Sequence, residues 1–495
     1  MPFTTNFRQD WFGNVRADIL AGIVVALALI PEAIGFAIIA GVDPAVGLWA
    51  SVAIAIVISF TGGRPGMISA ATAAVAVLVG PLVREHGVEY LFAATILMGI
   101  FQIIAGLLRL NLVMQFVSRS VITGFVNALA ILIFMAQLPQ LTDVTWHTYA
   151  MVLGGLAIIY LFPRVTTAVP SPLVSIIVLS ALSIGLGLPV HTVADMGELP
   201  SGLPSFSLPQ VPFTWETVQI VAPTAGAMAA VGLLESLLTA QIVDDMTHTD
   251  SYKRYECRGQ GIANIVAAMF GGMGGCAMIG QSVINITSGG RGRLSTFTAG
   301  FVLFVLLALF GPFVGQVPMP ALVAVMIMVS IGTFSWNSIP NLKRHPWQSS
   351  VVMLSTVVVV VATHDLSMGV LTGVLLSGIF FAQKVQRLFR IEREVSADGQ
   401  TATYRISGEI FFASVHRFIE QMQAEKETAP KVVIDMTHAH LWDISSVDAL
   451  DKIVGKLAKG GADVNVIGYN QASADIVDKF ALHDKTGFEL GTVPH

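Results

Sequence analysis

Long apolar segments recur along most of the chain, with short polar loops between them. Many approach the roughly 20 residues that a helix needs to cross a lipid bilayer. They are expected near residues 17–42, 45–60, 67–83, 90–108, 113–138, 146–163, 170–189, 218–243, 258–272, 276–288, 295–314, 319–333, 349–363 and 366–385. This pattern predicts an all-α polytopic membrane domain.

Several of these segments are too short to span a membrane alone. The segments that open at Met67 and Cys276 each follow a glycine-rich loop, and we expect them to be half-helices entered from an extended stretch. Non-helical backbone at membrane depth is tolerated only where it is buried in protein or lines a cavity. These two places are therefore candidates for a site.

Basic residues gather in alternate loops. They are Arg8, Arg16, Arg109, Arg119, Arg164, Lys253, Arg254, Arg258, Arg291, Arg293, Lys343, Arg344, Lys384, Arg387 and Arg390, whereas the long loop 191–216 has no lysine or arginine. Positive loops stay on the cytoplasmic side, so both termini are expected there, in an inner or plasma membrane. Arg291 and Arg293 are interpreted as topology signals.

The composition changes after Arg390. Residues 391–495 carry charges throughout and alternate like strands at 401–414, 431–438 and 463–469, with helical stretches at 415–427, 446–459 and 472–482. Strands that alternate with helices predict a small α/β domain. We therefore expect a membrane domain at 1–390 and a cytoplasmic domain at 391–495.

Composition narrows the classes of function. Hydrophobic residues make up 54% of the chain and charged residues 12%, and the net charge is −5. No basic surface for nucleic acid is expected. The two cysteines, Cys257 and Cys276, form no disulfide framework or metal-ligand pattern, and neither a cofactor nor an enzymatic nucleophile is predicted.

An internal repeat joins the two halves of the membrane domain. GGRPG at 62–66 matches GGMGG at 271–275, and Glu32 matches Glu235, with offsets of 209 and 203 residues. The repeats extend over about 15–190 and 215–388. Corresponding segments lie seven spans apart, which is an odd number, so the two repeats have opposite orientations in the membrane. Inverted repeats with interrupted helices are typical of secondary transporters. Half-helix N-termini that meet in one cavity favour an anion, because their N–H groups are free.

The motifs PEAIGFAIIAGVDPAVGLWAS, GLLESLLTAQIVDDMTHT, GQGIANIVAAMFGG and NITSGGR resemble the sulfate permease (SulP) family of anion transporters. Residues 391–495 resemble its STAS domain. The resemblance implies fourteen spans in two inverted repeats of seven, divided into core and gate domains, and usually a homodimer. It also implies an anion site between the third and tenth spans, with walls from the first and eighth.

Carried over by position, the resemblance predicts a substrate site and an ion-coupling site. The substrate site comprises Ile30, Pro31, Glu32, Ser69, Ala70, Ala71, Thr72, Met278, Ile279, Gly280, Gln281 and Ser282. The coupling site comprises Glu235, Glu32 and Thr239. An ionisable residue inside an apolar helix is functional by default, although Glu235 could instead be a structural carboxyl. Glu32 could lie at a simple proline kink, and Gln281 could brace its half-helix.

Two residues depart from the family pattern. Many members have Gln at the position of Glu32 and Arg at the position of Gln281. Burial and like-charge repulsion both favour the neutral form of a carboxyl group, so at least one of Glu32 and Glu235 is expected to be protonated when substrate binds. This favours proton-coupled symport, with sodium bound by Glu235 and Thr239 as the alternative. Asp244 and Asp245 are interpreted as solvated or capping groups.

A C4-dicarboxylate such as fumarate is favoured as the substrate, and sulfate and bicarbonate stay open. A passive anion channel and a nucleobase permease are the other candidates of similar architecture. In the soluble domain, Asp443 and Ser445 lie at the turn that carries a phosphorylatable serine in anti-sigma-factor antagonists, and a regulatory or docking role is expected there.

Overall fold

The computed structural model describes residues 7–109, 117–166, 170–197 and 204–481. It contains two compact units, residues 1–374 and 375–495. The larger unit is helical, and the smaller one is built around a mixed β-sheet.

The first half of the helical unit contains seven long helices after a short N-terminal helix, α1 (Phe7–Phe12). They are α2 (Val15–Ala40), α3 (Pro44–Thr61), α4 (Ala73–His86), α5 (Val88–Leu107), α6 (Arg119–Met135), α7 (Trp146–Leu161) and α8 (Ser171–Leu186). Local sequence fixes several of their ends. Gly41 closes α2 in the left-handed region at φ 74°, and Pro44 opens α3, in keeping with the preference for glycine after a helix and proline at its start.

The second half repeats this order. Its helices are α9 (Trp215–Thr247), α10 (Lys253–Met269), α11 (Ile279–Thr287), α12 (Arg293–Val314), α13 (Met319–Thr333), α14 (Ser338–Arg344), α15 (Trp347–Thr363) and α16 (Leu366–Gln386), of which α14 is a short connector. The described helices therefore give seven membrane elements per half, as predicted. Residues 113–116 of the predicted fifth span lie outside the described residues, and the described helix there begins at Arg119.

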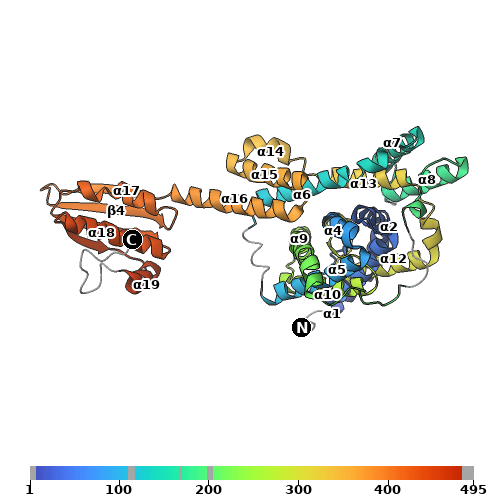
Figure 1. Cartoon of the computed structure of the whole chain (residues 1–495), viewed down its shortest axis with the longest axis horizontal. Coiled ribbons are helices and arrows are strands. Elements are labelled where there is room, and N and C mark those ends of the chain that lie inside the picture. Colours follow the sequence, from blue (N-terminus) through green and yellow to red (C-terminus); the bar gives the residue numbers. More distant parts are fainter. Residues whose placement is uncertain (1–6, 110–116, 167–169, 198–203, 482–495) are drawn as a thin grey trace. The chain divides into compact units, whose positions relative to one another are not determined.

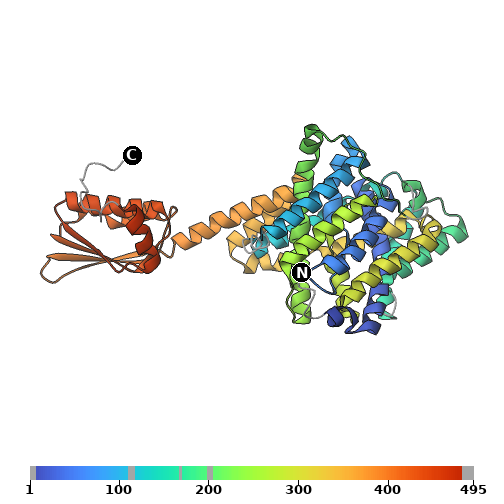
Figure 2. The same ribbon diagram turned by 90° about the horizontal axis from the view of Figure 1, so that it is seen from below.

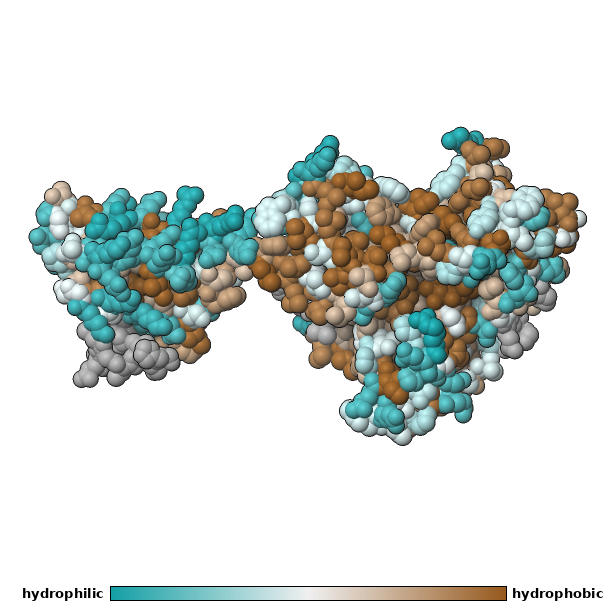
Figure 3. Space-filling model, turned by 45° about the horizontal axis from the view of Figure 1, so that its top comes forward, coloured by the Kyte–Doolittle hydropathy of each residue, from teal (hydrophilic) through white to brown (hydrophobic). Residues whose placement is uncertain are grey.

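The surface of the helical unit is broadly apolar (Figure 3). Eight helical stretches among the described residues are long and apolar enough to cross a membrane, and α8, part of α12 and α15 are shorter apolar helices. Apolar side chains such as Leu153 and Leu371 face outward at 68% and 54% exposure. Such a surface suits lipid rather than water.

The helices of this unit pack in two groups (Figure 1). In one group, α2, α3, α4, α5, α9, α10, α11 and α12 contact one another. In the other, α6, α7, α8, α13 and α15 do so. Helices α2 and α4 contact members of both groups, which places them at the boundary.

Two short strands replace helix inside the first group. Strand β1 (Ser69–Ala71) precedes α4, and β2 (Gly275–Ala277) precedes α11. They pair antiparallel, with Ser69 opposite Ala277 and Ala71 opposite Gly275. The predicted third and tenth spans are thus half-helices entered from extended chain, and both begin where one pair of strands ends.

The smaller unit has a four-stranded sheet in the order β3-β4-β5-β6. Its strands are β3 (Arg390–Val395), β4 (Thr401–Ile410), β5 (Lys431–Leu441) and β6 (Asp463–Ile467). Only β3 pairs antiparallel with its neighbour. Helices α17 (Val415–Met422), α18 (Ile444–Lys459) and α19 (Gln471–Phe480) pack against the sheet around a core that includes Phe418, Ile434 and Leu450 (Figure 2).

Several details of this unit differ from the sequence prediction. The predicted strand 401–414 ends at Ile410, because residues 411–414 form a turn in which the hydroxyl of Ser414 accepts a hydrogen bond from the N–H of Phe411. Strand β3 was missed because its sequence, RIEREV, is charged and largely exposed, as suits an edge strand that must not pair further. The predicted helix 415–427 is too long. It ends at Met422 because Gln423 adopts a left-handed conformation at φ 43°, and only a single 3-10 turn follows at Ala424–Lys426.

Candidate functional site

The strand pair brings the starts of α4 and α11 together. Thr72 is the residue before α4 and Met278 the residue before α11, and both have extended backbone. The strands run antiparallel, so the two half-helices leave the pair in opposite directions. Each helix start leaves its first N–H groups without an intrahelical acceptor. The geometry therefore places two positive helix ends at one location inside the bundle.

Glycine makes this close approach possible. A Cβ atom on Gly275 would lie 2.0 Å from the backbone oxygen of Ala70, and one on Gly272 would lie 2.7 Å from the Cα of Ala50. No other residue type fits at such separations, because real Cβ contacts are never this short. The glycine-rich run that signalled the repeat is thus a packing requirement of the strand pair.

The two helix starts differ in accessibility. Ala73 and Ala74 at the start of α4 are buried at 5% and 0% exposure. In contrast, Gly280 in the first turn of α11 is exposed, and a Cβ atom there would meet nothing within 4 Å. An anion can therefore reach the N–H groups at the start of α11 more easily than those at the start of α4.

Glu235 of α9 faces the strand pair. The thiol of Cys276 donates a hydrogen bond of 3.0 Å to its Oε2 atom, and the same sulfur lies 3.2 Å from the hydroxyl of Thr72. Cys276 is fully buried, whereas Glu235 is partly exposed. A chain of three polar side chains thus leads from a carboxyl group to the start of α4.

Glu32 reaches the same region from the other side. It follows Pro31 within the long helix α2, and its carboxyl group faces the side chain of Gln281 in α11. Glu32 and the preceding Ile30 are partly exposed, while Gln281 and Pro31 are buried. Helix α11 packs against both α2 and α9, so the two carboxyl groups lie on two different helices that flank it.

Several predicted site residues use their side chains to brace the structure. The hydroxyl of Ser69 accepts a 2.6 Å hydrogen bond from Gln260, and the hydroxyl of Ser282 accepts one of 3.0 Å from the backbone of Ile68. The Thr239 hydroxyl donates to the backbone oxygen of Glu235 at 2.8 Å. Ala70 and Ala71 are paired through the strand, and Met278 donates its N–H to Ile68. Binding roles for all of these residues stay predictions.

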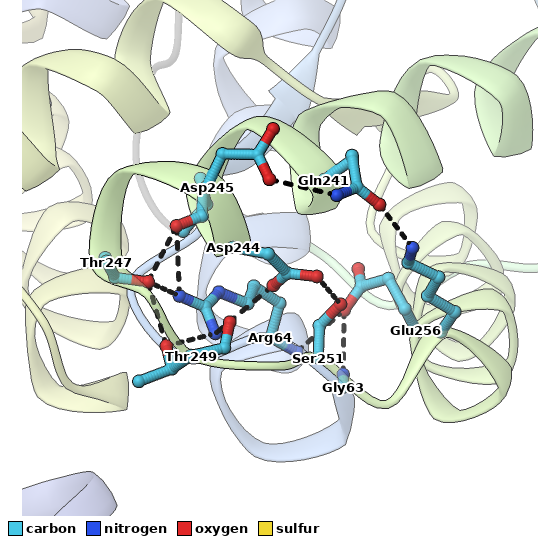
Figure 4. A network of polar contacts seen from close by, with 11 residues as sticks. Gly63, Arg64, Gln241, Asp244, Asp245, Thr247, Thr249, Ser251 and Glu256 are labelled. Atoms are coloured by element: carbon cyan, nitrogen blue, oxygen red, sulfur yellow. Dashed lines mark hydrogen bonds and ion pairs between the residues drawn. The ribbon is translucent and has the colours of Figure 1, made fainter.

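A buried polar network that the sequence did not reveal joins the loop after α3 to the loop between α9 and α10 (Figure 4). Glu256 of α10 accepts hydrogen bonds from the backbone N–H groups of Gly63 and Arg64 at 2.7 and 3.1 Å. The guanidinium of Arg64 lies 3.3 Å from Asp244 and also donates to Thr249 at 2.9 Å. The sequence feature that could have indicated this network is Arg64, the lone arginine inside the GGRPG motif.

This network corrects one interpretation. Asp244 is not a solvated or capping group, because its side chain is 9% exposed and pairs with a buried arginine. Asp245 is exposed and accepts a hydrogen bond from Gln241 of the same helix. A sequence pattern cannot distinguish two adjacent aspartates, since their difference comes from the direction in which each leaves the helix.

The predicted turn of the smaller unit has a structural aspartate and an exposed serine. Asp443 caps α18 by accepting a 2.9 Å hydrogen bond from the N–H of Ser446, and its other oxygen accepts one of 2.8 Å from Phe412. Ser445 is exposed in the first turn of that helix. Asp443 therefore fixes the turn that presents Ser445, whose regulatory role stays a prediction.

A helical membrane unit in which two oppositely directed half-helices start at a shared strand pair is the architecture of a secondary membrane transporter. Residues 15–153 and 140–356 match the model of the sulfate permease family, and residues 392–492 match that of the STAS domain. The chain belongs to the sulfate permease family.

Relatives and solved structures agree with this assignment. The chain is 57% identical to the putative sulfate transporter YbaR of Bacillus subtilis, over 96% of this chain and 98% of that one. The transmembrane domain of the cyanobacterial bicarbonate transporter BicA has a TM-score of 0.65 at 26% identity, covering 74% of this chain and 98% of its own. The murine anion transporter Slc26a9, in its inward-facing state, has the same fold, with a TM-score of 0.82 at 16% identity and coverage of 97% and 89%.

Proposed function

We propose that the protein is a proton-coupled symporter of small anions. The observation that carries this proposal is the position of Glu235, a carboxyl group within a membrane helix that is hydrogen-bonded to Cys276 of the strand pair. Glu235 provides a group that can gain and lose a proton beside the site where an anion would bind. The proton then accompanies the anion through the membrane.

Charge supports coupling rather than passive flow. Glu32 and Glu235 flank α11 from two helices, and if both were ionised they would repel an anion at its N-terminus. Gln281 offers no fixed positive charge to offset them. Protonation of at least one carboxyl group weakens the repulsion, so anion binding and proton binding favour each other. This is a favourable, negative coupling free energy between two sites, which is what symport requires.

The helix groups suggest how access alternates. The strand pair ties α4 and α11 to each other, so we propose that the first helix group moves as one core while the group containing α6, α7, α8, α13 and α15 acts as the gate. The boundary helices α2 and α4 contact both groups. The anion at the start of α11 would then face each side of the membrane in turn.

For the substrate we propose a small dicarboxylate such as fumarate, because Gln281 and Glu32 suit a protonatable organic anion better than a permanently charged one. Sulfate is the second candidate, because the relative that is 57% identical is named a putative sulfate transporter. Bicarbonate is the third, from the resemblance to BicA.

Uptake by purified protein in liposomes tests these points. Labelled fumarate, sulfate and bicarbonate are compared under an inward proton gradient and, separately, an inward sodium gradient. Glu235→Gln is the test variant. Glu216→Gln is the matched control, because Glu216 is an exposed glutamate in the first turn of the same helix.

We expect a proton gradient to drive uptake in the wild type and in Glu216→Gln but not in Glu235→Gln. Uptake driven by the sodium gradient alone would mean that sodium, bound by Glu235 and Thr239, is the coupling ion instead of the proton. Uptake that depends on neither the proton gradient nor the sodium gradient would indicate a passive channel. A Glu235→Gln protein that still responds to the proton gradient would remove Glu235 from the coupling role.

The remaining parts of the proposal concern orientation and assembly. We propose that both termini are cytoplasmic, that residues 391–495 form a regulatory STAS domain in which Ser445 or its turn is the contact point, and that the protein is a homodimer. To test the orientation, a single cysteine is added near one terminus of the protein and its labelling is measured in whole cells. Light scattering in detergent tests the dimer.

A further inference from the structure

A cavity lies at one end of the helical unit, away from the strand pair. Its volume is about 920 Å³. Its walls come from α1, the C-terminal ends of α3 and α5, the start of α10, and the loops after α3, α9 and α11. All of these ends belong to the face that the loop charges assign to the cytoplasm. The carrier mechanism proposed above makes no use of this cavity.

The cavity has an excess of positive charge. Four arginines line it, Arg64, Arg258, Arg291 and Arg293, against two aspartates, Asp10 and Asp250. Two of the arginines are engaged elsewhere. Arg64 pairs with Asp244, and Arg293 lies 3.5 Å from Asp10.

The other two arginines have no carboxylate within ion-pair distance among the residues that the structure describes. Arg258 lies 5.8 Å from the ring centre of Tyr255, and its stem packs where Gly106 of α5 leaves space. Arg291 donates to the backbone oxygens of Ile286 and Gly290 at 2.7 and 3.0 Å. Both guanidinium groups are thus positioned by neutral partners, and their charge stays uncompensated.

Another part of the cavity wall is apolar and exposed. Phe60, Leu107 and Ile262 line the cavity at 47%, 47% and 40% exposure, and Phe7 and Trp11 of α1 line it as well. A small hydrated anion gains nothing from such a wall. An amphiphile does, because burial of its hydrocarbon is worth about 0.8 kcal/mol per CH₂ group.

We propose that this cavity binds an anionic phospholipid of the cytoplasmic leaflet. Arg258 and Arg291 contact its phosphate, and one acyl chain lies along Phe60, Leu107 and Ile262. Juxtamembrane arginines attract anionic lipids in this leaflet. The assignment to the cytoplasmic leaflet rests on the proposed orientation, whereas the site itself does not depend on the coupling ion or on the transported anion.

The position of the cavity gives the lipid a route to the transport site. Gly62, Gly63, Arg64 and Pro65 line it, and this loop leads within a few residues to β1. Arg291 and Gly292 line it from the loop that follows α11. A bound lipid therefore contacts the loops on both sides of the strand pair and stabilises the arrangement from which α4 and α11 begin.

Binding can be measured with the full-length protein in detergent. Dioctanoyl phosphatidylglycerol, dioctanoyl phosphatidylcholine and inorganic phosphate are titrated while thermal unfolding is followed. We expect phosphatidylglycerol to raise the unfolding midpoint, and phosphatidylcholine and phosphate to do so much less. Equal effects of both lipids would leave the arginines without a role, and an effect of phosphate as large as that of phosphatidylglycerol would make this a site for a free anion.

Two sets of variants separate the halves of the site. Arg258→Gln and Arg291→Gln are each expected to weaken phosphatidylglycerol binding about fivefold, whereas Arg164→Gln, an exposed arginine in another loop, leaves it unchanged. Ile262→Ser changes a surface side chain and is expected to weaken lipid binding without disturbing the fold. Undiminished binding in the Arg258→Gln/Arg291→Gln double variant, or in Ile262→Ser, would overturn the proposal.

Discussion

The thiol of Cys276 lies between the carboxyl group of Glu235 and the hydroxyl of Thr72, at 3.0 Å from one and 3.2 Å from the other. Thr72 belongs to the first repeat, and Glu235 and Cys276 belong to the second. The contact therefore joins the proposed proton site to both halves of the transporter. It also makes Cys276 the side chain through which the orientation of Glu235 can be tested.

Replacement of Cys276 tests that orientation. Cys276→Ala removes the donor to Glu235, and we expect coupled uptake to fall about tenfold, since one hydrogen bond to such a group is worth roughly 1–2 kcal/mol. Cys276→Ser keeps a donor of similar size and is expected to retain most of the activity. The initial rate of uptake under a fixed proton gradient is the measurement. Equal rates for the alanine and serine variants would contradict a positioning role.

Two glycines near the strand pair should respond in opposite ways to alanine. At Gly280 a Cβ atom meets nothing within 4 Å, so Gly280→Ala is expected to leave stability unchanged. At Gly275 it would lie 2.0 Å from the oxygen of Ala70, and overpacking of this kind costs about 1–3 kcal/mol or more. Thermal unfolding in detergent compares the two variants. A bulkier side chain at Gly280, as in Gly280→Leu, should reduce substrate affinity while the protein stays folded.

The buried ion pair should matter more than an exposed charge in the same region. Arg64→Gln leaves Asp244 buried without its partner, and loss of one member of such a pair costs about 3–5 kcal/mol. Lys253→Gln removes only an exposed hydrogen bond to Gln241 and should cost about 0–1 kcal/mol. Unfolding midpoints of the purified variants decide between these outcomes. A similar small shift for both would mean that Asp244 is solvated after all.

The smaller unit should lose stability in acid through one glutamate. Arg393 donates two hydrogen bonds to Glu427, at 2.8 and 2.9 Å, and Tyr404 donates another. These contacts lower the pKa of Glu427 from 4.5 to about 2. Because the folded state holds the proton less tightly than the unfolded state, the stabilisation is complete above pH 4.5 and is lost as the pH falls towards 2.

Urea unfolding of a fragment spanning residues 387–495, which contains the hydrophobic core of the smaller unit, measures this effect. We expect the free energy of unfolding to fall between pH 4.5 and pH 2 in the wild type, with a smaller fall in Glu427→Gln. Arg393→Gln should reduce the slope as well, because it removes the main cause of the low pKa. A slope that is the same in all three proteins would exclude Glu427 as its source.

Apolar periodicity and loop charge predicted most of the fold. Each apolar segment corresponds to a described helix, because a bilayer leaves a chain few options other than helices of the right length. The interruptions before α4 and α11 were also predictable, since the glycine runs that allow the strands to approach are visible at 62–66 and 271–275. Edge strand β3 was not, because four of its six residues are charged.

Site geometry was predictable only in part. The sequence indicated Glu235 and Glu32 because carboxyl groups are rare in apolar helices. It could not indicate that Glu256 binds the loop at Gly63 or that Arg64 pairs with Asp244, because those contacts join residues that are far apart in the chain. Such pairs follow from how helices pack, and a single sequence does not record that.

The pairing of Ser69 with Ala277 also sets an order of events during synthesis. The ribosome completes β1 long before it reaches β2, and an unpaired strand edge inside a membrane costs several kcal/mol for each unsatisfied N–H or C=O group. A nascent chain that has reached only residue 190 therefore cannot finish its own fold. The insertion machinery must hold the first repeat until the second repeat has been synthesised. A truncated first repeat should therefore be degraded and should not accumulate.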